Sequence, residues 1–185
     1  MRLLFVGDVH MADRSPSKRD ANYRDDIFRK LEEIVEIAAK SKVDLVVFAG
    51  DLFHHKPPRD TTHRTVQQLI ALMESFVVPV YVCVGNHDIT EGRLESLEKQ
   101  PLGVVATAKN VTLMPSHIQE FNKQPGMLPV LTTENAAFHS IPGVPGITVE
   151  DYSLPSLVGT TWNVLVAHQS IVPDKSKLPT FLQDK

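Results

Sequence analysis

The chain has 185 residues, of which 42% are hydrophobic, and this is enough for one α/β domain with a sizeable core. Its formal net charge of −3 excludes a globally basic surface, so any nucleic-acid binding must use local patches or metal ions. Cys83, the single cysteine, excludes an internal disulfide and is expected to be a small buried hydrophobe. We expect a cytoplasmic protein with no membrane contact, because no apolar run approaches the roughly 20 residues that span a bilayer and Asp8 interrupts the region where a signal peptide is apolar.

The first apolar run, Arg2 to Val6, predicts a strand and is followed by Gly7, Asp8, Val9 and His10. One residue separates Asp8 from His10, so on an extended segment both side chains would point the same way and could share a metal ion. The polar segment from Met11 to Asn22 is expected to be a surface loop. Its basic residues, which could be solvated or could contact a phosphate backbone, are Arg14, Lys18 and Arg19.

A helix is predicted from Asp25 to Lys42, where apolar residues recur at helical spacing between acids at the start and lysines at the end. Val43 to Ala49 is a short apolar run that predicts a strand buried on both faces of a parallel sheet. Strand, helix and strand then form a right-handed crossover. Asp51 follows the second strand at its carboxyl end, where open α/β sheets bind ligands, and His54 and His55 come directly after it.

A second helix is predicted from Asp60 to Ser75, with His63 on its surface. The third apolar run, Val78 to Val84, predicts another strand, and the sequence Gly85-Asn86-His87-Asp88 follows it. A less regular polar helix is expected from Glu91 to Gln100.

From Val104 onward, short β-like runs separated by Pro and Gly predict a second, more antiparallel sheet packed on the first. These runs are Asn110–Met114, His117–Phe121, Val130–Thr132 and Ala136–Ile141. His117 and His139 lie in them without a Gly-Asp or Gly-Asn turn, so both are expected to be structural. Gly143–Gly159 is expected to be a loop.

The last predicted strand, Trp162 to Ala167, again ends in a histidine, His168, and the tail Ile171–Lys185 is expected to be a loop. Three earlier strands end in glycine followed by Asp or Asn, with a histidine close behind. A carboxylate that caps a helix would explain one Gly-Asp pair, but it explains neither the histidines nor the repetition. A cluster of nitrogen and oxygen metal ligands explains both.

The proposed ligands are Asp8, His10, Asp51, Asn86 and His168. This set has no thiolate, so it suits Mn²⁺, Fe²⁺ or Mg²⁺ better than a structural zinc ion. A carboxylate in the middle of the series can bridge two ions, and such a pair activates water and clamps the oxygens of a displacement at phosphorus.

His87 is then available as a general acid that protonates the leaving alkoxide, with Asp88 or a backbone carbonyl holding its tautomer. The alternative is that His87 is a metal ligand and Asn86 only a turn residue.

The motifs GDVH, GDLFHH, GNHD and AHQ resemble the calcineurin-like metallophosphoesterase family. Within it, GDLFHHKPP and VPVYVCVGNHD look like the SbcD-type nuclease subunit of double-strand-break repair complexes. The resemblance implies a four-layered α/β/β/α sandwich with mixed sheets. It also implies a Mn²⁺-dependent phosphodiesterase with two divalent metal ions, acting on DNA as a 3′-to-5′ exonuclease and as an endonuclease.

Carried over residue by residue, the resemblance implies that Asp8 and His10 bind one ion and that Asp51 bridges. Asn86 and His168 would bind the other ion. His87 would be the proton donor and His54 would assist near the scissile phosphate, whereas His55 matches no assigned role.

The resemblance further implies DNA and an SMC-like coiled-coil ATPase subunit as partners, and a homodimer in the full-length form. The family closes its site with a Gly-His-x-His turn that this sequence does not contain. Residues 1–185 are therefore expected to be a C-terminally incomplete nuclease core, without the capping and ATPase-docking regions, with weak metal binding and low activity. Two alternatives stay open: a phosphoesterase for nucleotides or other small esters, and an inactive interaction module.

Overall fold

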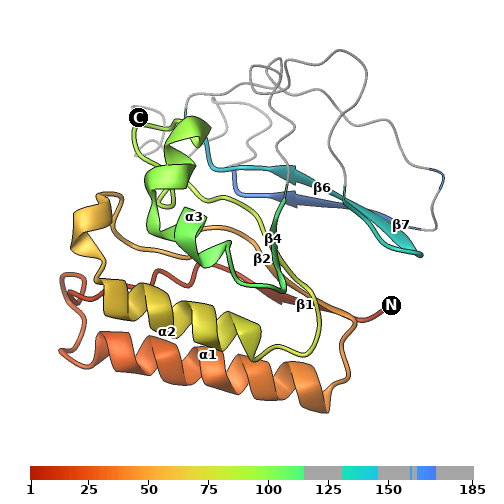
Figure 1. Ribbon diagram of the computed structural model, residues 1–185, viewed down its shortest axis with the longest axis horizontal. Coiled ribbons are helices and arrows are strands. Elements are labelled where there is room, and N and C mark those ends of the chain that lie inside the picture. The colour runs from red at the N-terminus through yellow and green to blue at the C-terminus, as the bar shows by residue number, and fades with distance from the viewer. Residues whose placement is uncertain (115–130, 146–158, 160–161, 170–185) are drawn as a thin grey trace, which may run out of the picture.

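The computed structural model of the chain describes residues 1–114, 131–145, 159 and 162–169. Two helices, α1 (Tyr23–Lys40) and α2 (His63–Glu74), lie side by side against one face of a first sheet. A second sheet packs on the opposite face (Figure 1). The described residues therefore form an α/β fold with one helical layer and two sheets.

The first sheet contains four parallel strands in the order β1 (Leu3–Val6), β2 (Leu45–Phe48), β3 (Val80–Val82) and β4 (Val111–Leu113). Parallel neighbours require crossover connections, which α1 and α2 supply between the first three strands. The carboxyl ends of all four strands consequently meet at one edge, where the loops after them come together.

Strand β2 is buried on both faces, as its continuous apolar sequence predicts. Val46 and Phe48 pack among the residues under the helices, whereas Leu45 and Val47 pack toward the second sheet. Cys83 lies between the sheets and is fully buried, so the expectation of a small buried hydrophobe is confirmed.

The two long helices have the expected polarity, with small differences at their ends. Helix α1 has two acids in its first turn and Lys40 in its last, which suits the helix dipole. Helix α2 begins at His63 rather than Asp60, because Pro58–Asp60 forms a 3-10 turn and the Thr62 hydroxyl then caps the helix by accepting from Thr65 N–H at 3.3 Å. His63 is exposed, as expected.

The second sheet has the order β5 (Leu131–Thr132), β6 (Ala136–Ile141) and β7 (Trp162–Ala167). The bounds of β6 and β7 are those expected from the sequence. The β5–β6 pair is antiparallel, but the β6–β7 pair is parallel, which departs from the more antiparallel sheet expected. His139 is buried in β6, and its Nε2 lies 3.2 Å from Asn163 Oδ1.

The region between β3 and β4 corrects two expectations. The polar helix expected over Glu91–Gln100 is a 3-10 helix, Leu94–Lys99, followed by the short helix α3 (Pro101–Val105). Pro101 is suited to the first turn of a helix because it has no N–H to leave unpaired. Helix α3 brings the chain back parallel to β3, so the expected Asn110–Met114 run joins the first sheet as β4 rather than the second.

Several expectations lie outside the described residues, namely the His117–Phe121 run with His117, most of the Gly143–Gly159 loop and the Ile171–Lys185 tail. A fourth, outer helical layer stays a prediction. None of the helices in the described ranges combines the length and apolar character needed to cross a lipid bilayer.

Candidate metal centre

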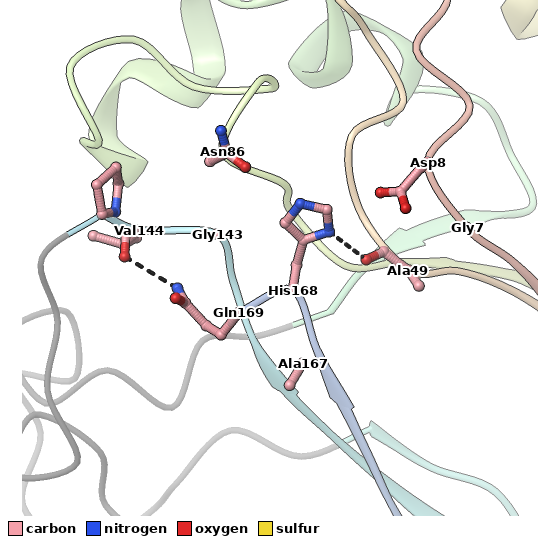
Figure 2. Close-up of a pocket in the computed structure, with 10 residues that line it drawn as sticks. Gly7, Asp8, Ala49, Asn86, Gly143, Val144, Ala167, His168 and Gln169 are labelled. Carbon is pink, nitrogen blue, oxygen red and sulfur yellow. Dashed lines mark hydrogen bonds between the residues drawn. The ribbon is translucent and has the colours of Figure 1, made fainter. Parts of the chain in front are cut away.

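The polar residues at the strand tips gather at one edge of the two sheets. Asp8 follows β1, Asp51 follows β2, Asn86 follows β3, and His168 comes from the end of β7 in the second sheet. Figure 2 shows Asp8, Asn86 and His168 around one cavity of about 530 Å³. The structure thus brings together residues that are far apart in the sequence.

The backbone at this edge is in a conformation that non-glycine residues rarely adopt. The φ angles of Asp8, His10 and Asp51 are 43°, 50° and 49°. Such left-handed residues are held by their surroundings and concentrate at functional sites. Asp8 and His10 are not extended, so the alternation of an extended segment does not apply to them, and an ion shared by the two stays a prediction. Potential ligand atoms of His10 lie near those of His54 and His87, and those of Asp8 near those of Asp51 and His168.

Asp51 is the central acid of the site and only 4% exposed. Its Oδ2 lies 3.5 Å from His10 Nε2 and 3.3 Å from His168 Nε2, and its Oδ1 accepts the His87 backbone N–H at 2.8 Å. Burial alone would raise the pKa of Asp51, but the hydrogen bonds from His168 and from the His87 N–H outweigh it and lower the pKa. Asp51 is therefore an ionised carboxylate between two imidazoles.

His168 is oriented by a backbone carbonyl. Its Nδ1–H donates to Ala49 O at 2.8 Å (Figure 2). Its other ring nitrogen, Nε2, lies 3.3 Å from Asp51 Oδ2. Metal-binding histidines are commonly held in this way. In the metal-free protein the hydrogen bond with Asp51 raises the pKa of His168 to about 9 against the opposing effect of burial.

His87 is oriented in the same manner. Its Nδ1 lies 2.6 Å from His54 O, and because a carbonyl only accepts, Nδ1 carries the hydrogen and Nε2 faces away. Either Asp88 or a backbone carbonyl was expected to fix the tautomer of His87, and in the structure it is the carbonyl. Asp88 instead accepts the N–H groups of Gly85, Leu52 and Phe53 at 2.9, 3.3 and 3.0 Å, and burial raises its pKa to about 6.

The loops that carry His10 and His54 are joined by backbone hydrogen bonds. His10 N–H donates to Asp51 O, Met11 N–H to Leu52 O, and His54 N–H to Met11 O, each at 2.9 Å. The two imidazoles meet with Nδ1 atoms 3.4 Å apart. Burial lowers the pKa of both histidines, which favours the neutral form that binds metal ions.

Two glycines of the repeated motif allow this close approach. Gly50 has a φ of 109°, and a Cβ there would lie 2.3 Å from His168 Nδ1. A Cβ on Gly85 would lie 2.0 Å from the backbone N of Asp51. The glycines before Asp51 and Asn86 are therefore required by contacts between strand tips, which the repeated sequence pattern hinted at.

Sequence reasoning missed two residues beside the cavity. Gly143 was placed only in a loop, yet a Cβ there would lie 2.3 Å from Asn86 N. Gln169 Nε2 donates to Val144 O at 3.0 Å (Figure 2). It also donates to Pro142 O at 2.7 Å, and the two bonds fix that loop against the end of β7. Only the AHQ motif gave any signal, and it pointed to His168.

A third missed residue, Asp13, fastens the basic loop to the helices. Its carboxylate accepts from Thr62 N–H at 2.6 Å and from Arg24 Nε at 3.1 Å, and it also accepts from the Thr65 hydroxyl. These bonds outweigh the effect of burial and lower the pKa of Asp13. His55, which had no expected role, lies against His54 with ring centroids 4.9 Å apart.

These residues fit a pair of divalent cations. Asp8, Asp51 and His168 can place one ligand atom each within 4.8 Å of one another, and Asn86 lines the same cavity with its amide. The donors are carboxylate oxygens and imidazole nitrogens, and carbonyl groups already fix the tautomers of His168 and His87.

The sequence matches the calcineurin-like phosphoesterase family over residues 1–180. The DNA double-strand break repair protein Mre11 of Aeropyrum pernix is 38% identical over 99 residues, covering 52% of this chain and 23% of that protein. Mre11 of Methanosarcina acetivorans is 26% identical over 181 residues, covering 94% of this chain and 26% of that protein. The chain thus spans about a quarter of the length of these relatives.

Among solved structures, a dimetal phosphatase from Danio rerio superimposes with a TM-score of 0.49 at 19% identity, covering 75% of this chain and 43% of that one. The family match extends over nearly the whole sequence and includes every strand tip described above. Members of this family carry a dinuclear metal site, which agrees with the Asp and His clusters. The chain therefore belongs to the calcineurin-like phosphoesterase family.

Proposed function

We propose that the chain is a binuclear metal-dependent phosphodiesterase that acts on DNA. The observation that carries this proposal is the position of Asp51, whose Oδ2 lies 3.5 Å from His10 Nε2 and 3.3 Å from His168 Nε2. A buried, ionised carboxylate between two imidazoles suits a ligand that bridges two ions. Asp8 and His10 would complete one ion's protein ligands, and Asn86 and His168 the other's.

The metal assignment follows from the donor atoms. Oxygen-rich sets favour Mn²⁺ and Mg²⁺ over softer ions, and Mn²⁺ also accepts imidazole, so we propose two Mn²⁺ ions. When bound, such a pair supplies an activated water and neutralises charge on the phosphoryl oxygens. The protein's own part is to hold Asp51 ionised and His168 in one tautomer.

His87 is proposed as the proton donor. Its Nδ1–H stays on the His54 carbonyl at 2.6 Å, so the proton that reaches the leaving alkoxide departs from Nε2. The same carbonyl keeps the ring in place during the transfer, because it accepts the hydrogen bond from Nδ1–H. His54, whose ring stacks on that of His87 with centroids 5.6 Å apart, is proposed to assist beside the scissile phosphate.

DNA is proposed as the substrate because the relatives reported above are DNA double-strand break repair proteins. Local charge is compatible with this, since Arg14, Lys18 and Arg19 are exposed on the loop that Asp13 holds beside the site. We propose both 3′-to-5′ exonuclease and endonuclease activity, in an intracellular, DNA-associated setting.

The remaining inferences from the resemblance are retained as proposals. Residues 1–185 are proposed to be one metallophosphoesterase core with the fold of a four-layered α/β/β/α sandwich with mixed sheets. Its proposed partners are DNA, an SMC-like coiled-coil ATPase and a second copy of the chain.

The test compares two phosphodiesters in the presence of Mn²⁺: linear DNA labelled at its 3′ end and bis(p-nitrophenyl) phosphate. The alkoxide that leaves from DNA needs a proton, whereas p-nitrophenolate does not. His87→Gln should therefore lower kcat on DNA by about 10²–10⁴-fold, the range for a general acid, and on the chromogenic ester far less. His63→Gln, at the exposed start of α2, is the matched control and should leave both rates unchanged.

Equal losses on both substrates would refute the assignment of His87 as the proton donor. Hydrolysis of the chromogenic ester but not of DNA would instead favour an enzyme for nucleotides or other small esters, which the cavity of about 530 Å³ can accommodate. Absence of any Mn²⁺-dependent hydrolysis would favour the interaction module.

A further inference from the structure

Three half-buried imidazoles, those of His10, His54 and His87, form a second group of potential metal ligands. Each offers one ring nitrogen, and these nitrogens all lie within 4.8 Å of one another. The group shares no residue with the Asp8, Asp51 and His168 group and contains no carboxylate. Two sets of donors with different chemistry therefore lie next to each other.

The spacing of the imidazoles suits a tetrahedral ion. His10 Nδ1 and His54 Nδ1 are 3.4 Å apart. With Zn–N bonds of about 2.0–2.1 Å, tetrahedral geometry places two ligand nitrogens about 3.3–3.4 Å apart. His87 has its Nδ1–H on the His54 carbonyl, so its Nε2 lone pair is available as the third ligand.

The tautomer of His10 connects this group to the dinuclear centre. As a ligand of the Mn²⁺ pair, His10 would use Nε2, which lies 3.5 Å from Asp51 Oδ2, and would keep its proton on Nδ1. If His10 instead binds the same ion as His54, His10 must use Nδ1. Its proton then sits on Nε2, and the Asp51 carboxylate can accept a hydrogen bond from it. A neutral imidazole has one lone pair, so the two uses of His10 exclude each other.

We propose that His10, His54 and His87 form a distinct Zn²⁺ site, and that Zn²⁺ bound there blocks the dinuclear centre. Three imidazoles favour Zn²⁺ over Mn²⁺, both by donor type and by the general order of affinities of divalent metals. Zn²⁺ at this site removes His10 from the Mn²⁺ pair and occupies Nε2 of His87. The inhibitory consequence rests on the proposed function, whereas the binding site itself does not.

Binding is tested on the metal-free, full 185-residue chain, with Zn²⁺ alone titrated against a chromophoric chelator. His54→Gln should weaken the tightest Zn²⁺ site by more than about 100-fold, because it loses a direct ligand rather than a supporting contact. Asp8→Asn, which alters only the oxygen-containing group, and His63→Gln should leave that affinity unchanged. Unchanged binding by His54→Gln, or loss of the site in Asp8→Asn, would overturn the proposal.

A measurement on the unaltered protein does not depend on how any variant folds. Zinc X-ray absorption at one equivalent of Zn²⁺ should show a shell with three imidazoles. A shell that contains carboxylate oxygen would place the ion in the Asp8, Asp51 and His168 group and would overturn the assignment.

The inhibitory step is measured as Mn²⁺-dependent hydrolysis of the chromogenic ester. Added Zn²⁺ should lower the rate, and excess Mn²⁺ should restore it. If the rate is unaffected while the three-histidine site is filled, the inhibitory role is wrong. If no hydrolysis is seen even without Zn²⁺, the proposed function fails, and the binding results still decide whether the site exists.

Discussion

Gly85→Ala is predicted to destabilise the fold, because Gly85, in the loop after β3, lies directly against Asp51, in the loop after β2. A Cβ at this position would lie 2.0 Å from the backbone N of Asp51 and 2.2 Å from its Oδ1. Asp51 cannot easily withdraw, since its carbonyl accepts the His10 N–H at 2.9 Å. The N–H of Gly85 itself donates to buried Asp88 at 2.9 Å. Any movement that relieves the clash therefore disturbs hydrogen bonds on both sides.

The magnitude follows from two effects. Forcing an extra methyl into a packed site costs about 1–3 kcal/mol. Weakening a hydrogen bond to a buried group costs a further 1–3 kcal/mol or so. We expect Gly85→Ala to lower the free energy of unfolding by about 2–5 kcal/mol, a large share of the 5–15 kcal/mol typical of a domain.

Gly7→Ala is the matched control, because Gly7 precedes Asp8 in the same sequence pattern but a Cβ there meets no atom within 4 Å. Its effect on the free energy of unfolding should stay within about 1 kcal/mol. Both variants are compared with the wild type by urea unfolding without metal, followed by far-UV circular dichroism. If Gly85→Ala proves no more destabilising than Gly7→Ala, the close approach is not what requires glycine at this position.

Two further predictions follow from ionisable groups. The pKa of His168 rises from 6.5 to about 9 on folding. Its contribution to the free energy of unfolding is therefore fully present below pH 6.5 and is lost as the pH rises through 9. Urea unfolding of the metal-free chain should show a loss of about 1–3 kcal/mol over this range that is absent from His168→Gln; an unchanged slope would contradict it. Burial raises the pKa of Cys83 to about 12, so a thiol reagent at pH 8 should label it only after unfolding. Rapid labelling of the folded chain would refute the burial of this thiol.

The strands were predictable from the sequence because each is a short apolar run that ends at a turn signal. The region after β3 was not predictable to the same degree. Helix α3 has only five residues, Pro101–Val105, which is too short for a helical period to appear. Without that helix the β4 run had no visible crossover, so its parallel place in the first sheet was missed.

The candidate site was partly predictable, since parallel strands bring their carboxyl ends to one edge whatever the loops contain. This argument brought Asp8, Asp51 and Asn86 together correctly. Contacts between distant segments left little or no signal, as with Gly143 against Asn86 and Asp13 against Thr62. Such contacts depend on how loops pack, and neither periodicity nor spacing encodes that packing.

His10 shows where sequence spacing stops being informative about chemistry. Its distance of two residues from Asp8 suggested one shared ion, but both residues have left-handed backbone, so spacing alone does not say which way each side chain points. The two nitrogens of the His10 ring have different neighbours. Nε2 lies 3.5 Å from Asp51 Oδ2, and Nδ1 lies 3.4 Å from His54 Nδ1. Which nitrogen binds a metal ion is therefore decided by the competition between a carboxylate and an imidazole. In our proposals, that competition decides whether His10 joins the Mn²⁺ pair or the Zn²⁺ site.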